Sequence, residues 1–249
     1  HRPLRYVFDE AHHLFNAADS AFSAHLSGQE TAALRRWLIG AEGTSRSRSR
    51  GLRTRVEEIV AGNEGAEKAL DDALHAARAL PGPSWHQRIT DGRPDGPAEA
   101  FLLLVRHQVY ARVGNSDGPF DLEASLHPTI DGLREAASLL TSKLQDIPRP
   151  LVHLMAALHK ILSDESETLE PQTRVKIEAV SASLERRAIN QIAAWRSMLA
   201  ALENETPEEF VDWFGIQRKG GRDMDVGFFR HWVDPTKPLA EEVYKPAHG

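Results

Sequence analysis

Apolar residues recur at helical spacing along most of the chain. Between residues 126 and 144 they lie three or four positions apart, and broader apolar stripes run through 148–162 and 171–202. This spacing places one face of a helix against a core. Because short segments with helix-starting prolines separate the stripes, we expect these helices to pack as an antiparallel bundle. Further helices are expected from residue 28 and over 56–80 and 98–113, with a loop at 81–97.

Two regions near the chain ends have a strand pattern instead. Residues 4–8 form a short apolar run with β-branched and aromatic side chains, typical of a strand buried on both faces. Residues 210–233 hold two β-prone runs on either side of Gly220-Gly221, which predicts a hairpin, followed by a final helix through Tyr244. The expected fold is therefore mainly α, an antiparallel helical bundle with a small β part at the two chain ends.

Composition narrows the class of protein. A formal charge of -6 argues against a protein that coats nucleic acid indiscriminately, so any such contact must come from a local basic patch. The absence of cysteine excludes a disulfide framework or a thiolate metal site within these residues. No apolar run approaches the length of a membrane span, so we expect a cytoplasmic protein with no membrane partner.

Asp9 and Glu10 directly follow the strand expected at 4–8. Ligands bind at the carboxyl ends of strands in open α/β sheets, where two carboxylates can hold a Mg²⁺ ion and orient a water molecule. One alternative is an ordinary strand followed by a helix that begins with acidic residues. Metal binding by His12 and His13 is disfavoured, because adjacent helical residues point about 100° apart and do not form the i, i+4 pair of a zinc helix.

The tetrapeptide Asp9-Glu10-Ala11-His12 matches the DEAH motif of superfamily 2 helicases letter for letter. With His13-Leu14 it most resembles the DinG/XPD-like DNA helicases. The resemblance implies an ATP-dependent DNA helicase (an ATP hydrolase) acting in DNA repair, with ATP and Mg²⁺ as cofactors of the full-length parent. It assigns Mg²⁺ binding to Asp9 and activation of the attacking water to Glu10. It also implies that His12 couples the γ-phosphate site to neighbouring motifs, and it places the cysteines of any iron-sulfur cluster upstream of the DEAH motif.

The resemblance also divides the chain. Residues 1–27 are expected to be a motor-domain piece that carries the strand ending in the DEAH motif, which is the Walker B motif of this family. Residues 28–206 are expected to form a helical domain like the arch of these helicases, and residues 207–249 a second motor-domain piece. No stretch fits the phosphate-binding loop G-x-x-x-x-G-K-[ST], and the Ser-Ala-Thr motif that follows in the family is missing. We therefore interpret the chain as a fragment that is inactive alone, with the remainder of the motor domains as its partner.

The strongest basic patch is an arginine-serine run between Glu42 and Glu57 with no acidic residue inside it. Arginine grips phosphate oxygens without reading bases, which suits contact with single-stranded or forked DNA. The alternative is a solvated loop. The candidate DNA-binding residues are Arg46, Arg48, Arg50, Arg53 and Arg55.

Two other functions remain open on the sequence alone. One is a helical protein-interaction module in which the DEAH tetrapeptide is incidental, and the other is a DinG-like nuclease. For the helicase interpretation we expect the two chain ends to meet in space, because an inserted domain leaves and rejoins its host where its ends are close. We also expect an exposed sheet edge that promotes dimerisation of the fragment.

Overall fold

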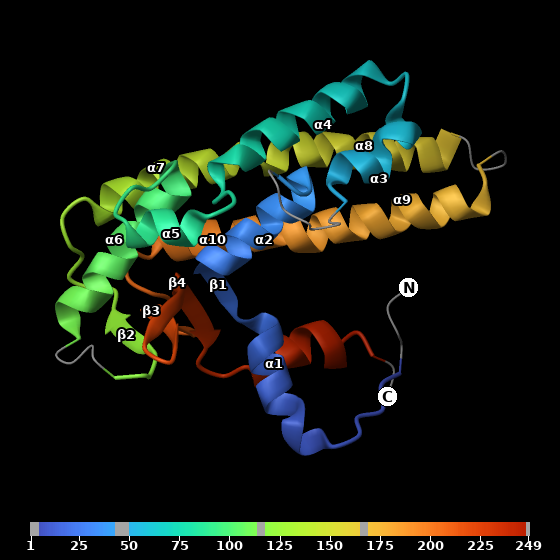
Figure 1. Cartoon of the computed structure of the whole chain (residues 1–249). Coiled ribbons are helices and arrows are strands. Elements are labelled where there is room, and N and C mark those ends of the chain that lie inside the picture. The colour runs from blue at the N-terminus through green and yellow to red at the C-terminus, as the bar shows by residue number, and fades with distance from the viewer. Residues whose placement is uncertain (1–4, 43–49, 114–117, 165–168, 248–249) are drawn as a thin grey trace.

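The computed structural model describes residues 5–42, 50–113, 118–164 and 169–247, and it is mainly α with one small antiparallel sheet (Figure 1). This confirms the fold class expected from the sequence. The helices are α1 (Leu14–Phe22), α2 (Gly28–Ile39), α3 (Leu52–Val60), α4 (Glu64–Ala76), α5 (Trp85–Thr90), α6 (Pro97–Arg112), α7 (Leu133–Gln145), α8 (Pro148–Asp164), α9 (Pro171–Leu184), α10 (Gln191–Ala200) and α11 (Thr236–Leu239). The strands are β1 (Ala24–Ser27), β2 (Leu122–Ser125), β3 (Phe210–Lys219) and β4 (Arg222–Trp232).

Helices α4, α8 and α9 form the long layer of the bundle, in which α8 packs against both of the others (Figure 1). Proline opens α8 and α9, as the sequence predicts. The helix expected over 171–202 is present, but a π-helical segment, Glu185–Asn190, separates α9 from α10. This wider turn keeps one apolar face in the core on both sides, since Leu184, Ala188 and Ile192 are fully buried.

The sheet has the order β1-β4-β3-β2, with all neighbours antiparallel. Gly220 and Gly221 join β3 to β4, and both have positive φ, which a two-residue hairpin turn of type I′ requires. The predicted hairpin is thus confirmed. Side chains alternate between the two faces, and Phe214 and Phe228 point with no exposed surface into the core, where Phe214 meets the ring of Phe101 from α6.

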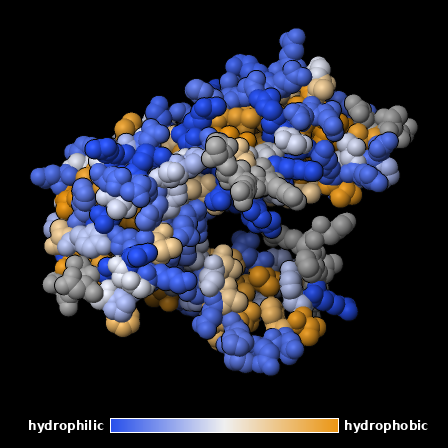
Figure 2. Space-filling model, in the orientation of Figure 1, coloured by the Kyte–Doolittle hydropathy of each residue, from blue (hydrophilic) through white to orange (hydrophobic). Residues whose placement is uncertain are grey.

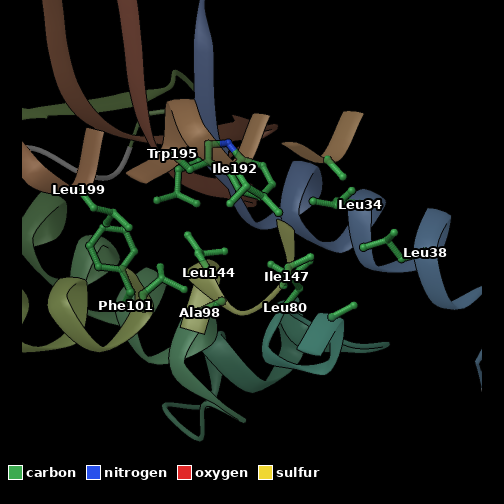
Figure 3. Packing of buried hydrophobic residues seen from close by; sticks show 14 of the residues in the cluster. Leu34, Leu38, Leu80, Ala98, Phe101, Leu144, Ile147, Ile192, Trp195 and Leu199 are labelled. Atoms are coloured by element: carbon green, nitrogen blue, oxygen red, sulfur yellow. The ribbon is translucent and has the colours of Figure 1, made fainter. Parts of the chain in front are cut away.

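A continuous apolar core joins the sheet to the helices. Figure 3 shows Trp195 and Ile192 of α10 facing residues of α2, α6 and the α7–α8 junction. The indole of Trp195 is fully buried, and its Nε1 donates to the carbonyl of His25 at 2.7 Å. This hydrogen bond satisfies the buried indole and fixes β1 against α10.

The two ends of the chain pack together, as expected. Helix α1 contacts α11, β1 pairs with β4, and the Phe8 ring meets Tyr244 edge-on at 6.0 Å. The strand expected at 4–8 is wrong, however, because residues 5–8 are exposed and in no strand, and Val7 is 97% exposed. The position beside β4 is taken by β1, so no described strand pairs with this run.

Three further expectations need correction. The segment 81–97 is not only a loop, because it contains α5. The range 28–206 is not purely helical, since it contributes β2 to the sheet. The helix expected from residue 126 begins only at Leu133.

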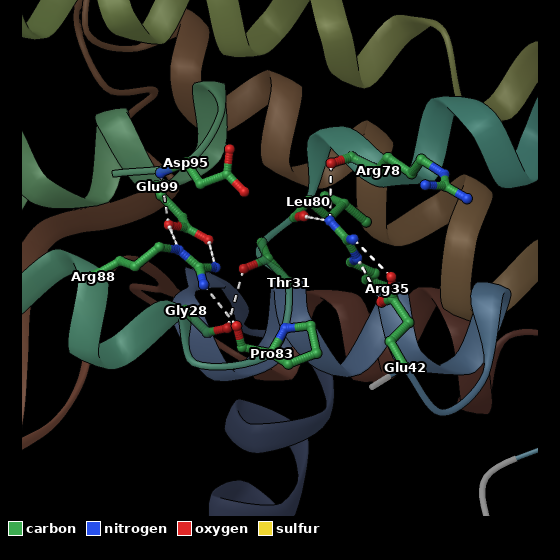
Figure 4. Close-up of polar contacts among 10 residues, drawn as sticks. All are labelled: Gly28, Thr31, Arg35, Glu42, Arg78, Leu80, Pro83, Arg88, Asp95 and Glu99. Atoms are coloured by element: carbon green, nitrogen blue, oxygen red, sulfur yellow. Dashed lines mark hydrogen bonds and ion pairs between the residues drawn. The ribbon is translucent and has the colours of Figure 1, made fainter. Parts of the chain in front are cut away.

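Polar contacts fasten the 81–97 segment, and Leu80 just before it, to neighbouring elements (Figure 4). Arg35 of α2 grips Glu42 through two contacts of 2.8 Å and also donates to the carbonyl of Leu80 at 2.6 Å. The hydrogen bond from Arg35 lowers the pKa of Glu42. Arg88 of α5 pairs with Glu99, which has no exposed surface. The side chains of Arg35 and Arg88 therefore stabilise the fold.

Candidate functional site

The acidic pair of the DEAH segment lies on the surface before α1. Asp9 and Glu10 are both exposed, and the Asp9 carboxylate accepts a hydrogen bond of 3.0 Å from the Glu10 backbone N–H. Glu10 has a φ of 51°, in the left-handed region that non-glycine residues rarely adopt. The strand end that was expected to fix these carboxylates is therefore absent from the described residues.

His12 turns back toward the acidic pair. Its Nδ1 lies 3.2 Å from a carboxylate oxygen of Glu10, with both side chains about two-thirds exposed (65% and 70%). An exposed pair of this kind contributes little to stability. In the described part of the chain, no group of three or more His, Asp or Glu side chains is arranged to hold a metal. Asp9 and Glu10 could thus bind Mg²⁺ only with other ligands, such as nucleotide phosphates.

The arginine run divides into parts with different environments. Arg46 and Arg48 lie outside the described residues. Arg50 is exposed, whereas Arg53 forms an ion pair with Asp71 of α4. The Arg55 Nε donates to the Arg50 carbonyl at 3.1 Å, and its guanidinium lies 5.7 Å from the ring centre of Trp37.

Arg50 and Arg55 line an open groove of about 580 Å³ between α2, α3 and α9. Lys176 of α9 adds a third cation, Trp37 supplies an aromatic surface, and none of the described lining residues is acidic. We call this the basic groove. Its lining residues are Trp37, Arg50, Thr54, Arg55, Lys176, Ala179, Val180 and Ser183.

The sequence did not reveal the full set of residues in the basic groove. Lys176 and Trp37 lie on α9 and α2, far from the arginine run in sequence, and the pattern of each helix alone does not link them to it. Only the packing of α3 against α2 and α9 brings them beside the arginines. Cations together with an aromatic ring can neutralise phosphates and stack a base, which is the chemistry of single-strand binding.

Comparison of the chain with family models, curated proteins and solved structures found no match in any of the three. Among the helices that the structure describes, none has both the length and the apolar character needed to cross a membrane.

Proposed function

We propose that this chain is part of a DinG/XPD-like ATP-dependent DNA helicase, carrying its DEAH motif and a helical domain that helps enclose single-stranded DNA. The observation that carries the proposal is that the two chain ends pack together, through β1 with β4 and α1 with α11, although the helical bundle lies between them in sequence. A domain inserted into a motor domain needs this arrangement.

The surface around the chain ends supports a larger host. Figure 2 shows apolar residues on the part formed by α1 and α11, which a hollow separates from the helical bundle. Val7, Phe8, Phe15 and Tyr244 are between 41% and 97% exposed. Apolar side chains gathered on one surface are typical of a face that another segment covers.

In the proposed helicase, Asp9 holds Mg²⁺, Glu10 activates the attacking water and His12 couples the γ-phosphate site to neighbouring motifs. The triphosphate itself would be held by a phosphate-binding loop, which no stretch of these 249 residues matches. Hydrolysis therefore requires the remainder of the motor domains, and we expect no magnesium-dependent ATP turnover by this chain alone.

The catalytic part of the proposal is tested in a polypeptide that extends upstream of His1 to include a phosphate-binding loop. Glu10→Gln should abolish ATP hydrolysis while nucleotide binding, followed with a fluorescent analogue, is kept. Three outcomes would each contradict the helicase assignment: ATP turnover by the isolated chain, unchanged turnover by the Glu10→Gln variant, or an upstream sequence with no phosphate-binding loop.

The DNA-binding part is tested on the isolated chain by fluorescence anisotropy with a labelled single-stranded oligonucleotide. Replacing Arg50, Arg55 and Lys176 by alanine should weaken binding. Each phosphate contact on single strands contributes about -0.7 to the slope of log affinity against log salt, so the slope should become shallower by about 2.

A charge-matched control removes three exposed cations from another surface of the bundle: Lys143, Arg149 and Lys160. This control should leave the salt slope near its original value. Equal effects of the two triple variants would show that binding is diffuse and that the basic groove is not the site. Arg46→Ala with Arg48→Ala tests whether the rest of the run contributes.

The interaction-module alternative has one observation in its favour, because Asp9 and Glu10 stand on an exposed segment outside any strand. A phosphate-binding loop in the sequence upstream of His1 would favour the helicase, and its absence would favour the interaction module. The nuclease alternative is tested by incubating labelled single-stranded DNA with the upstream-extended polypeptide and Mg²⁺, since cleavage without unwinding would favour that function.

A further inference from the structure

Two histidines face each other on the outer face of the sheet. His25 of β1 is opposite Phe229 of β4, so His231, two residues further along β4, lies on the same face as its diagonal neighbour. The two Nε2 atoms are 3.2 Å apart. Residues separated by most of the chain thus bring two ring nitrogens to one point.

The other nitrogen of each ring lies near a carboxylate. His231 Nδ1 is 2.9 and 3.0 Å from the two oxygens of Asp19 in α1. His25 Nδ1 is 3.4 Å from one oxygen of Glu30 in α2, whose second oxygen accepts from Gln191 at 2.8 Å. The chain of contacts is therefore carboxylate, imidazole, imidazole, carboxylate.

The tautomers of the two rings decide what the Nε2 atoms can do. With a hydrogen on Nδ1 of each ring, both imidazoles face their carboxylates and turn a bare Nε2 toward each other, and these two nitrogens can then bind one cation. With the His25 hydrogen on Nε2 instead, His25 donates to His231 and no cation is needed. A metal ion between the rings selects the first arrangement.

We propose that His25 and His231 bind a divalent transition metal of the zinc type through their Nε2 atoms. Zinc–nitrogen bonds are about 2.0–2.1 Å long, so two of them at a tetrahedral angle place the nitrogens about 3.3–3.4 Å apart, close to the observed distance. Histidines that bind metals almost always donate the second ring N–H to a carboxylate or carbonyl, which fixes the tautomer. Here Asp19 and Glu30 take that role for both rings.

The site opens onto a pocket of about 250 Å³ that both histidines line together with Trp213 and Glu123. Water molecules can complete the coordination there, because no third His, Asp or Glu of the described residues joins the two histidines as a metal ligand. The Trp213 ring lies 4.9 Å from the ring of His231 and so provides a fluorescent reporter. Since Asp19, His25, Glu30 and His231 come from α1, β1, α2 and β4, a bound metal would link the chain ends to the bundle.

The test is titration of the untagged chain with Zn²⁺ by calorimetry at pH 6, in two buffers with different ionisation heats. We expect one equivalent to bind with release of protons, because a ligating imidazole nitrogen must be unprotonated, so that the apparent heat depends on the buffer. In long-range ¹H–¹⁵N spectra, the Nε2 signals of His25 and His231 should shift. Cu²⁺ should quench the part of the tryptophan emission that comes from Trp213, one of five tryptophans, at the same stoichiometry.

Variants locate the site. His25→Gln or His231→Gln should weaken Zn²⁺ binding at least tenfold. Asp19→Asn keeps both ligands and should weaken it by about 10- to 100-fold, the usual effect of removing the partner of a ligating histidine. This variant keeps the test valid if a histidine variant does not fold.

His12 and His13, whose rings lie 3.9 Å apart, are the matched control pair. His12→Gln with His13→Gln should leave the affinity unchanged. The proposal is overturned if this control loses the metal, or if Zn²⁺ produces neither saturable heat nor an Nε2 shift, in which case the two rings only form a hydrogen bond with each other.

Discussion

Arg230 and Asp212 form a buried ion pair directly across β3 and β4. Their side chains are 6% and 1% exposed, and the guanidinium makes contacts of 2.6 and 2.7 Å with the carboxylate and donates to Ser197 at 3.0 Å. Asp212→Asn would leave a buried charge without its counter-ion. We expect the free energy of unfolding, measured with urea, to fall by about 3–5 kcal/mol.

The control for this prediction is the exposed pair Lys68 and Asp72 on α4, whose side chains are 75% and 54% exposed. Lys68→Ala should change the free energy of unfolding by about 0–1 kcal/mol. Similar losses in the two variants would show that Arg230 is solvated in solution.

A second prediction at the residue scale concerns pH. Burial is the main cause that raises the pKa of Asp225, which is 4% exposed, although hydrogen bonds from Ser27, Gln29 and Val226 act in the opposite direction. Above the ordinary Asp pKa of about 3.9, the folded chain therefore binds more protons than the unfolded chain until the raised pKa is passed. Through this interval the contribution of Asp225 to the free energy of unfolding falls as pH rises.

Asp225→Asn removes this contribution and keeps a side-chain oxygen as acceptor. The free energy of unfolding of the variant minus that of the parent should therefore increase with pH through the interval and then level off. Urea unfolding across the acidic and neutral range measures this difference. A difference that stays constant with pH would show that the carboxyl titrates normally.

At the scale of elements, the junction of α2 and α5 depends on one glycine. A Cβ atom on Gly28 would lie 2.2 Å from ring atoms of Trp85, so the indole of the short α5 packs directly on the start of α2. Gly28→Ala should lower the free energy of unfolding by about 1–3 kcal/mol, because the ring must shift.

Gly65→Ala in α4 is the matched substitution, since the nearest atom to its Cβ would be 3.6 Å away. It should raise the free energy of unfolding by about 0.5–1 kcal/mol, because alanine favours the helix. Thermal and urea unfolding of both variants measure the contrast. A neutral Gly28→Ala would mean that Trp85 does not pack there in solution.

The long helices and the hairpin could be predicted because their signals are local: regular apolar spacing, proline at helix starts and the Gly220-Gly221 turn. Helix α5 could not, because it is short and its segment is rich in proline and glycine. The run at 5–8 has strand composition, but a strand forms only with a partner, and β1 occupies the place beside β4.

The candidate sites were predictable only in part, because some of their residues meet only through contacts between distant parts of the chain. Arg50 and Arg55 stood out as a run of like charges, whereas Lys176 joins them only through the packing of α3 on α9. His25 and His231 are separated by 206 positions and meet only through the register of β1 with β4. Contacts across this distance leave no signal in the spacing of residues along one chain.

At the scale of the whole molecule, the meeting of the chain ends decides whether the helical bundle can be an insertion. The ends are held by the sheet, by α1 against α11 and by the Phe8–Tyr244 contact at 6.0 Å. The chain has no native cysteine, so a pair of introduced thiols reports on this contact alone. Phe8→Cys with Tyr244→Cys should be linked rapidly and nearly completely by a short bifunctional thiol reagent.

The control pair is Phe8→Cys with Leu139→Cys, because α7, which carries the exposed Leu139, lies across the molecule from the chain ends (Figure 1). It should not be linked at equal reagent concentration. Intact-mass measurement counts the linked species in both variants. Linkage at equal rates would mean that residues 5–8 sample the whole surface, and linkage in neither would mean that the ends separate. In either case the geometry that supports an inserted helical domain would be lost. Selective linkage would show that the chain ends lie together, as the helicase proposal requires of a bundle inserted into the motor domain.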